Sequence, residues 1–204
     1  MDEKQALLTQ HAVTSASHLL LSPFLSQEWV DSIDALGARY TYVDVTLQGF
    51  IDMRMLTKAI STTSATHVVV SPFNNTPETL QTTLPTIHTP LLPRNAPPEI
   101  LSLYTKLFDG NRDVTYFAHP QASSFALFLA PYLFCPKEEI VAALRQAKIA
   151  VSLLPKPRES LFVAHQVWQS FLGLPLDISL DEAQKSAQTL LAILEQHALR
   201  RCTF

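Results

Sequence analysis

The sequence predicts an α/β protein made of two parts, a three-layer unit with a mostly parallel sheet and a smaller C-terminal α/β domain. Short apolar runs recur at 18–21, 40–43 and 67–70, and helical patterns separate them. Continuous apolar runs of this kind suit parallel strands that are covered on both faces. We place the first unit at residues 1–96 and the second at 97–204.

Helical segments are expected to flank the strands of the first unit. Residues 3–16 form a weakly amphipathic pattern. Ser26 can cap a second helix, and Gly37 can end it, because glycine adopts the left-handed conformation at the least cost. Asp52 can cap a third helix. Consecutive strand–helix units favour parallel strands with right-handed connections.

The stretch from Asn74 to Pro98 is rich in proline and threonine and reads as a linker. Within it we expect a short helix at 77–83 and an extended piece near 86–92. This stretch therefore separates the two predicted domains.

The second domain is expected to combine a small sheet with helices on one side. Pro98 and Pro136 can each begin a helix, because proline suits the first helical turn. A capping box at 179–182 precedes the last helix, where a serine and a glutamate satisfy each other's backbone groups. The other expected elements are strands at 113–118, 124–130 and 149–154 and a helix at about 158–171.

Composition narrows the class of protein. The chain has 204 residues, of which 47% are hydrophobic and 16% charged, so it can bury a sizeable core. A net charge of -3 gives no basic surface for nucleic acid or for a membrane. With only Cys135 and Cys202, no apolar signal core and no membrane-length apolar run, we predict a cytoplasmic protein.

Two common kinds of site are missing from the sequence pattern. The four glycines are far apart, whereas phosphate-binding loops need clustered glycines so that backbone N–H groups can approach the anion. The seven histidines show no spacing typical of metal ligands. We therefore expect neither a nucleotide-binding loop nor a metal site.

Polar residues follow the predicted strands, at the ends where α/β folds bind ligands. Ser22 and Ser71 each begin a Ser-Pro-Phe triplet, Phe24 closes the first triplet, and Asp44 follows the second strand. His119 lies at an expected turn. These five residues form our candidate ligand crevice. For Asp44 a helix-capping or solvated carboxylate is the alternative, and the repeated triplet can arise by chance.

Two loop arginines, Arg94 and Arg158, could bind an anion. Exposed loop arginines usually do not, since water screens their charge. Neither is therefore assigned to the candidate crevice.

Several segments resemble the DegT-like sugar-nucleotide aminotransferases, which are pyridoxal-phosphate (PLP) enzymes of fold type I. The segment 21–38, LSPFLSQEWVDSIDALGA, is similar to the family's strand, loop and helix. Val43-Asp44-Val45 and Phe50-Ile51-Asp52 resemble its "VDVD…NID" run, and 174–194 resembles its "LPLH…SLTEED" ending. About half of the chain is covered, in matching order. The resemblance implies a PLP-transferase-like fold in shortened form.

The departures from the family pattern concern the cofactor. No lysine occurs between Phe73 and Ile100, where the family's Schiff-base lysine is expected, and the first acidic residue there is Glu78, in a threonine-rich loop. Ser26 stands where the family places an aromatic side chain against the cofactor ring. A Gly-Thr-Ser type turn for the phosphate is also absent. We therefore assign no catalytic, cofactor-binding or metal-binding residue.

These features favour a catalytically degenerate relative that acts as a binding or assembly module, without a cofactor. The resemblance implies a homodimer, and a protein partner is a further expectation. One alternative is an active PLP-dependent aminotransferase in glycan or sugar-nucleotide biosynthesis, completed by a partner chain that supplies the lysine. Another is an unrelated α/β domain that binds a small molecule.

Overall fold

The computed structural model describes residues 2–71, 82–89, 96–118, 124–130, 136–158 and 160–201, without the side chains of 198–201. Contacts divide the chain into two units. The first comprises Met1–Pro90 and Pro155–Gln166, and the second comprises Leu91–Leu154 and Val167–Phe204. The first unit thus includes a segment that is distant in the sequence, which a single boundary along the chain does not anticipate.

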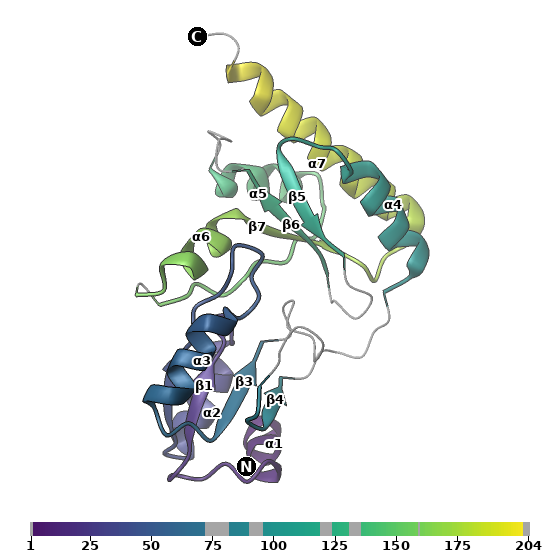
Figure 1. The fold of residues 1–204 in the computed structure, drawn as a ribbon. Coiled ribbons are helices and arrows are strands. Elements are labelled where there is room, and N and C mark those ends of the chain that lie inside the picture. Colours follow the sequence, from purple (N-terminus) through teal and green to yellow (C-terminus); the bar gives the residue numbers. More distant parts are fainter. Residues whose placement is uncertain are drawn as a thin grey trace. The chain divides into compact units, whose positions relative to one another are not determined.

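The first unit contains a four-stranded sheet in which every pair of neighbours is parallel (Figure 1). The strands, in the order β2-β1-β3-β4, are β2 (Arg39–Tyr42), β1 (His18–Leu21), β3 (His67–Val70) and β4 (Thr86–His88). The prediction of a parallel α/β sheet is confirmed.

The fourth strand lies within the extended piece expected near 86–92, in the stretch that we read as a linker. Ile87 of β4 is buried and pairs in register with Val69 of β3. Three residues among prolines are too few for a strand pattern to stand out, and the pairing partner alone reveals the strand. Most of the short helix predicted at 77–83 lies outside the described residues.

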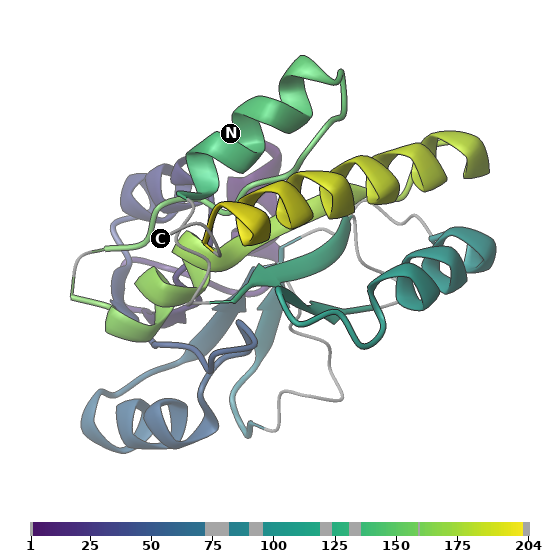
Figure 2. The same cartoon turned by 90° about the horizontal axis from the view of Figure 1, so that it is seen from above.

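Helices cover both faces of this sheet. Leu19 and Leu21 point into a core with α1 (Glu3–Gln10) and α2 (Gln27–Ala35). Leu20, between them, belongs to a second core with α3 (Met53–Thr62). Because neighbouring side chains of a strand point to opposite faces, the two cores lie on opposite sides of the sheet. The predicted three-layer arrangement is confirmed, as Figure 2 shows.

Some of the helix ends in the first unit lie where the sequence predicts them, and others do not. Asp52 caps α3, since its carboxylate accepts the backbone N–H groups of Arg54 and Met55 at 2.8 and 3.3 Å. Gly37 follows α2 with a φ of 69°, as expected for a left-handed terminator. The prediction for 3–16 is too long, because α1 ends at Gln10 and Ala12 has a left-handed φ of 59°.

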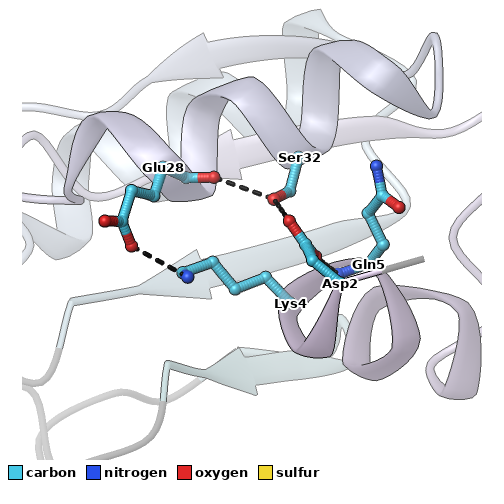
Figure 3. Close-up of polar contacts among 5 residues, drawn as sticks. All are labelled: Asp2, Lys4, Gln5, Glu28 and Ser32. Carbon is cyan, nitrogen blue, oxygen red and sulfur yellow. Dashed lines mark hydrogen bonds and ion pairs between the residues drawn. The ribbon is translucent and has the colours of Figure 1, made fainter.

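Polar contacts fasten α1 to α2 (Figure 3). The Asp2 carboxylate accepts the backbone N–H of Gln5 at 2.7 Å and the Ser32 hydroxyl at 3.1 Å. Lys4 forms an ion pair with Glu28 at 2.8 Å. The first helix is therefore capped and attached to its neighbour by the same few side chains.

The second unit has a three-stranded antiparallel sheet in the order β5-β6-β7. One core cluster joins the face of β6 that carries Phe125 and Leu127 to three helices, as the prediction of helices on one side requires. Tyr104 donates its hydroxyl to the carbonyl of Pro175 at 3.0 Å. The elements are α4 (Pro98–Phe108), β5 (Val114–Phe117), β6 (Ser124–Leu129), α5 (Lys137–Gln146), β7 (Phe171–Pro175) and α7 (Leu180–Arg201).

In the second half of the chain, one sequence prediction is wrong and another is confirmed with shorter bounds. The segment 149–154 is not a strand, because only Ser152 exchanges backbone hydrogen bonds with Gly173, at 2.8 and 2.9 Å. The helix expected at 158–171 is α6 (Phe162–Ser170), and Phe171 is the first residue of β7. The apolar residues of β7 pair with β6. This tertiary pairing outweighs the helical spacing of the apolar residues, which had placed Phe171 in the helix. The capping box at Ser179 and Glu182 is confirmed.

Gly173 leaves no room for a side chain. A Cβ atom there would lie 2.6 Å from the Ser124 Oγ and 3.0 Å from the Ser152 Cβ. We expect Gly173→Ala to lower the free energy of unfolding by about 1–3 kcal/mol, as overpacking of a core does. Urea unfolding of the single variants and of Gly173→Ala/Ser124→Gly measures the coupling. A Gly173→Ala variant as stable as the parent would contradict this reading.

The attachment of α1 should weaken in acid. The Gln5 N–H, more than any other contact, lowers the pKa of the Asp2 carboxyl below its ordinary 3.8. A lowered folded-state pKa gives stability that is present above the unfolded value and is lost as the pH falls through the folded one. The protection of the α1 amides against exchange, relative to their intrinsic rates at the same pH, should therefore fall below pH 3.8. Asp2→Asn, which cannot ionise, should remove that acid step.

Candidate functional site

The carboxyl ends of the four parallel strands bring polar side chains to one edge of the first sheet. In sheet order these are Asp44 after β2, Ser22 after β1, Ser71 after β3 and Thr89 after β4. The backbone N–H of Ser22 donates to the carbonyl of Val69, so the ends of β1 and β3 are adjacent. The repeated Ser-Pro-Phe triplet thus marks neighbouring strand ends.

These side chains are withdrawn from solvent. Ser22 is 0% exposed, and Phe24, Ser71 and Thr89 are at most 3% exposed. Sequence reasoning missed Thr89, because β4 was not recognised as a strand. His119, the fifth predicted residue, lies outside the described residues.

The hydroxyl of Ser22 has no hydrogen-bond partner in the part of the chain that the structure describes. Thr89, by contrast, donates its hydroxyl to the carbonyl of Val70 at 2.9 Å. A buried polar atom without a partner costs about 1–3 kcal/mol, and such atoms are uncommon enough to need an explanation. Ser22 is thus the member of this edge that can still accept a contact.

Asp44 has a structural role at this edge. Its carboxylate accepts the backbone N–H groups of Ala164 at 2.9 Å and Val163 at 3.2 Å, and that of Val45 at 2.9 Å. Val163 and Ala164 lie in the first turn of α6, where backbone N–H groups have no partner within the helix. Asp44 therefore caps α6 from about 120 residues away. The capping alternative for Asp44 is confirmed.

Three segments that meet at Asp44 carry exposed apolar side chains. The loop after Asp44 is closed by pairing of Val45 with Ile51, and the N–H of Asp52 donates to the Asp44 carbonyl. The exposed side chains are those of Leu47 in the loop (63% exposed), Met55 in α3 (47%) and Phe162 at the start of α6 (71%).

Other kinds of site are not found in the described ranges. These residues contain no group of three or more His, Cys, Asp or Glu side chains placed to hold a metal ion. Among the described helices, none has the length and apolar character needed to cross a membrane.

No family model matches the sequence. No curated protein matches it either. Several solved structures do match the fold. The aminotransferase TlmJ from Streptoalloteichus hindustanus has a TM-score of 0.78 at 10% identity, covering 95% of this chain and 84% of that chain.

Two further neighbours are similar. Helicobacter pylori PseC, an aminotransferase involved in the biosynthesis of pseudoaminic acid, has a TM-score of 0.73 at 12% identity, covering 95% of this chain and 85% of that chain. The sugar aminotransferase CalS13 from Micromonospora echinospora has a TM-score of 0.71 at 12% identity, covering 93% and 84%. The chain has the fold of the sugar aminotransferases. At these identities the likeness is one of fold.

The described residues do not fit PLP. In the family, a lysine forms the Schiff base and a carboxylate pairs with the ring nitrogen. The described lysines of the first unit are Lys4 in α1, Lys58 in α3 and Lys156 in a loop, and none of them directly follows a strand of the sheet. Asp44, the acid at that edge, is held by three backbone N–H groups. No reaction step is therefore derived through PLP.

Removal of the distant cap should destabilise the protein. We expect Asp44→Ala to lower the free energy of unfolding by about 1–2 kcal/mol, the usual range for a lost N-terminal cap. Asp44→Asn keeps one acceptor oxygen and should lose about half as much. Denaturant unfolding measures both. Equal stability of all three proteins would show that the cap contributes nothing.

Proposed function

We propose that this chain is a catalytically degenerate relative of the PLP-dependent sugar aminotransferases and acts as a binding or assembly module. The observation that carries the proposal is the state of Asp44. This carboxylate stands at the edge where α/β folds bind ligands, yet its oxygens are used to cap α6. The chain thus has the fold of the sugar aminotransferases, while a carboxylate that could take part in a reaction caps a helix.

The chemistry of transamination explains why this matters. When bound, PLP provides an electron sink for bond breaking next to an amine. An enzyme must anchor PLP through a lysine amine, keep the ring nitrogen protonated with a carboxylate, and hold its phosphate. The described carboxyl edge offers two buried serines, a threonine bonded to a backbone carbonyl and a capping aspartate instead.

The same edge supports a binding role. Ser22 has a buried hydroxyl without a partner in the described part of the chain. The folded state does not depend on that hydroxyl. Alanine at position 22 would fill nearly the same space and would avoid the free-energy cost of a buried, unpaired polar atom. A group that costs stability and serves no contact in the free protein is well suited to meet a ligand.

We further propose that the chain assembles as a homodimer through the exposed apolar side chains near Asp44. Burial of apolar surface contributes about 25 cal/mol for each Å² removed from water. Leu47, Met55 and Phe162 are large, exposed and carried by segments that meet. A different protein partner is the alternative occupant of this surface.

A second candidate function is an active PLP-dependent aminotransferase in glycan or sugar-nucleotide biosynthesis. It is favoured by the neighbours themselves, which are aminotransferases. In that case a partner chain would supply the lysine amine.

Cofactor binding separates these two functions. Incubation with PLP, reduction with borohydride and peptide mapping should yield only scattered, substoichiometric adducts on surface lysines. Ser22→Ala, which leaves every lysine in place, should give the same pattern. One lysine modified stoichiometrically, with a saturable absorbance band, would replace the degenerate reading with the enzymatic one.

Sedimentation velocity over a concentration series tests assembly. The parent should dimerise, and Phe162→Ser should weaken the dimer about tenfold, as expected when a large apolar side chain leaves an interface. The matched control is Leu180→Ser, which removes an apolar side chain that is 49% exposed in the second unit. A parent that stays monomeric at every concentration would eliminate the homodimer.

A further inference from the structure

A second pocket lies in the first unit, beside the carboxyl ends of β1 and β2. Its walls come from the loop that follows β1, from α2, from the edge strand β2 and from the loop that precedes α6, and its volume is about 170 Å³. The polar side chains that line it are Gln27, Asp34, Tyr40, Tyr42, Lys156 and Arg158. None of the predicted crevice residues is among them. The space exceeds what a single water molecule needs.

Two tyrosines hold Arg158 in place. Its Nη2 donates to the Tyr40 hydroxyl at 3.2 Å, and its guanidinium lies 4.9 Å from the centre of the Tyr42 ring and 5.6 Å from that of Tyr40. The two rings meet edge to face, with centroids 5.7 Å apart. Cation–π contact and the hydrogen bond restrict a long side chain that would otherwise move freely in water.

Arg158 is oriented but not neutralised. A guanidinium has five N–H donors, and the hydroxyls of Tyr40 and Tyr42 take only part of them. Among the described residues, no carboxylate forms an ion pair with it. Arginine presents its donors as a planar fork that matches a carboxylate or a phosphate. The remaining donors of Arg158 are therefore available to an oxyanion.

The start of α2 adds to the positive character of the pocket. Gln27, the first residue of this helix, lines the cavity, and the side chain of Ser26 makes no capping hydrogen bond. The N-terminal backbone N–H groups of a helix carry a partial positive charge. The arginine and the helix start thus point to the same kind of ligand.

The formal charges of the lining favour an anion. Lys156 and Arg158 are positive, and Asp34 is negative, which leaves one net positive charge. Burial raises the pKa of the Tyr42 hydroxyl, so this phenol is neutral near pH 7. Glu28, in the first turn of α2, is paired with Lys4. Asp34 is therefore the group in the pocket that opposes an anion.

We propose that this pocket binds a small oxyanion, borne by a phosphate ester or by a carboxylate, with Arg158 as its main anchor. Lys156 and the start of α2 add favourable charge. The two tyrosines position the arginine and do not themselves carry charge. The inference does not rest on the proposed loss of catalysis, because Ser22, Asp44, Ser71 and Thr89 are not among the residues that line the pocket.

Calorimetric titration of the full chain with inorganic phosphate, and separately with succinate, tests the site. We expect millimolar binding of at least one of them. Arg158→Gln should weaken it about tenfold, as the loss of charge-assisted hydrogen bonds does. Asp34→Asn should strengthen it about threefold by removing the opposing charge. Phosphate binding alone would indicate a phosphate ester, and succinate binding alone a carboxylate.

The control is Arg39→Gln, which makes the same charge change on β2 outside the pocket lining and should leave binding within about twofold of the parent. Thermal unfolding confirms that each variant is folded. The gain expected from Asp34→Asn stays informative even where Arg158→Gln fails to fold. Absence of binding by both anions, or equal weakening by Arg39→Gln and Arg158→Gln, would overturn the proposal.

Discussion

The contact between Asp44 and the first turn of α6 is the constraint on which the first unit depends. The carboxylate follows the edge strand β2, and the N–H groups that it accepts belong to residues 119 and 120 positions later. A helix start needs partners for its first N–H groups, and the Asp44 carboxylate supplies them for Val163 and Ala164. The contact explains why Pro155–Gln166 belongs to the first unit although most of its sequence neighbours belong to the second.

That constraint also shapes what the fold can do. In an α/β sheet the carboxyl edge is where side chains of several strands converge and where ligands usually bind. Here polar side chains still converge at that edge, yet the side chains of Asp44 and Thr89 form hydrogen bonds with backbone groups. Ser22 is the exception, since its hydroxyl is buried without a partner in the described residues. The likeness to sugar aminotransferases is therefore a likeness of scaffold, and function has to be argued from the side chains themselves.

The loop before α6 has a second consequence. Because Asp44 holds the start of this helix, the loop lies along the edge strand and brings Lys156 and Arg158 to the rings of Tyr40 and Tyr42. An arginine that would be an ordinary exposed cation in a free loop becomes an oriented one. The cap thus links the stability of the unit to the geometry of a binding pocket.

Local patterns in the sequence determined the parallel strands β1, β2 and β3, the cap at Asp52, the left-handed Gly37 and the capping box of α7. Each depends on residues that are close together in the chain, and so does the order of segments that revealed the family resemblance. The strand β7 was not predicted, and its first residue, Phe171, was placed at the end of a helix. For β4 only an extended piece within a linker was predicted. Both are short, and both are strands because they pair with β6 and β3.

Tertiary structure alone decided the site. The sequence placed Ser22, Asp44 and Ser71 at strand ends, but burial, the unpaired hydroxyl and the capping role follow from neighbours that are distant in the chain. Arg158 is an exposed loop cation, as its sequence context suggested, but only the structure shows that it contacts Tyr40 and Tyr42 on β2. Periodicity reports which face of an element is buried, whereas hydrogen bonds and charge contacts depend on atoms that the chain brings together only when it folds.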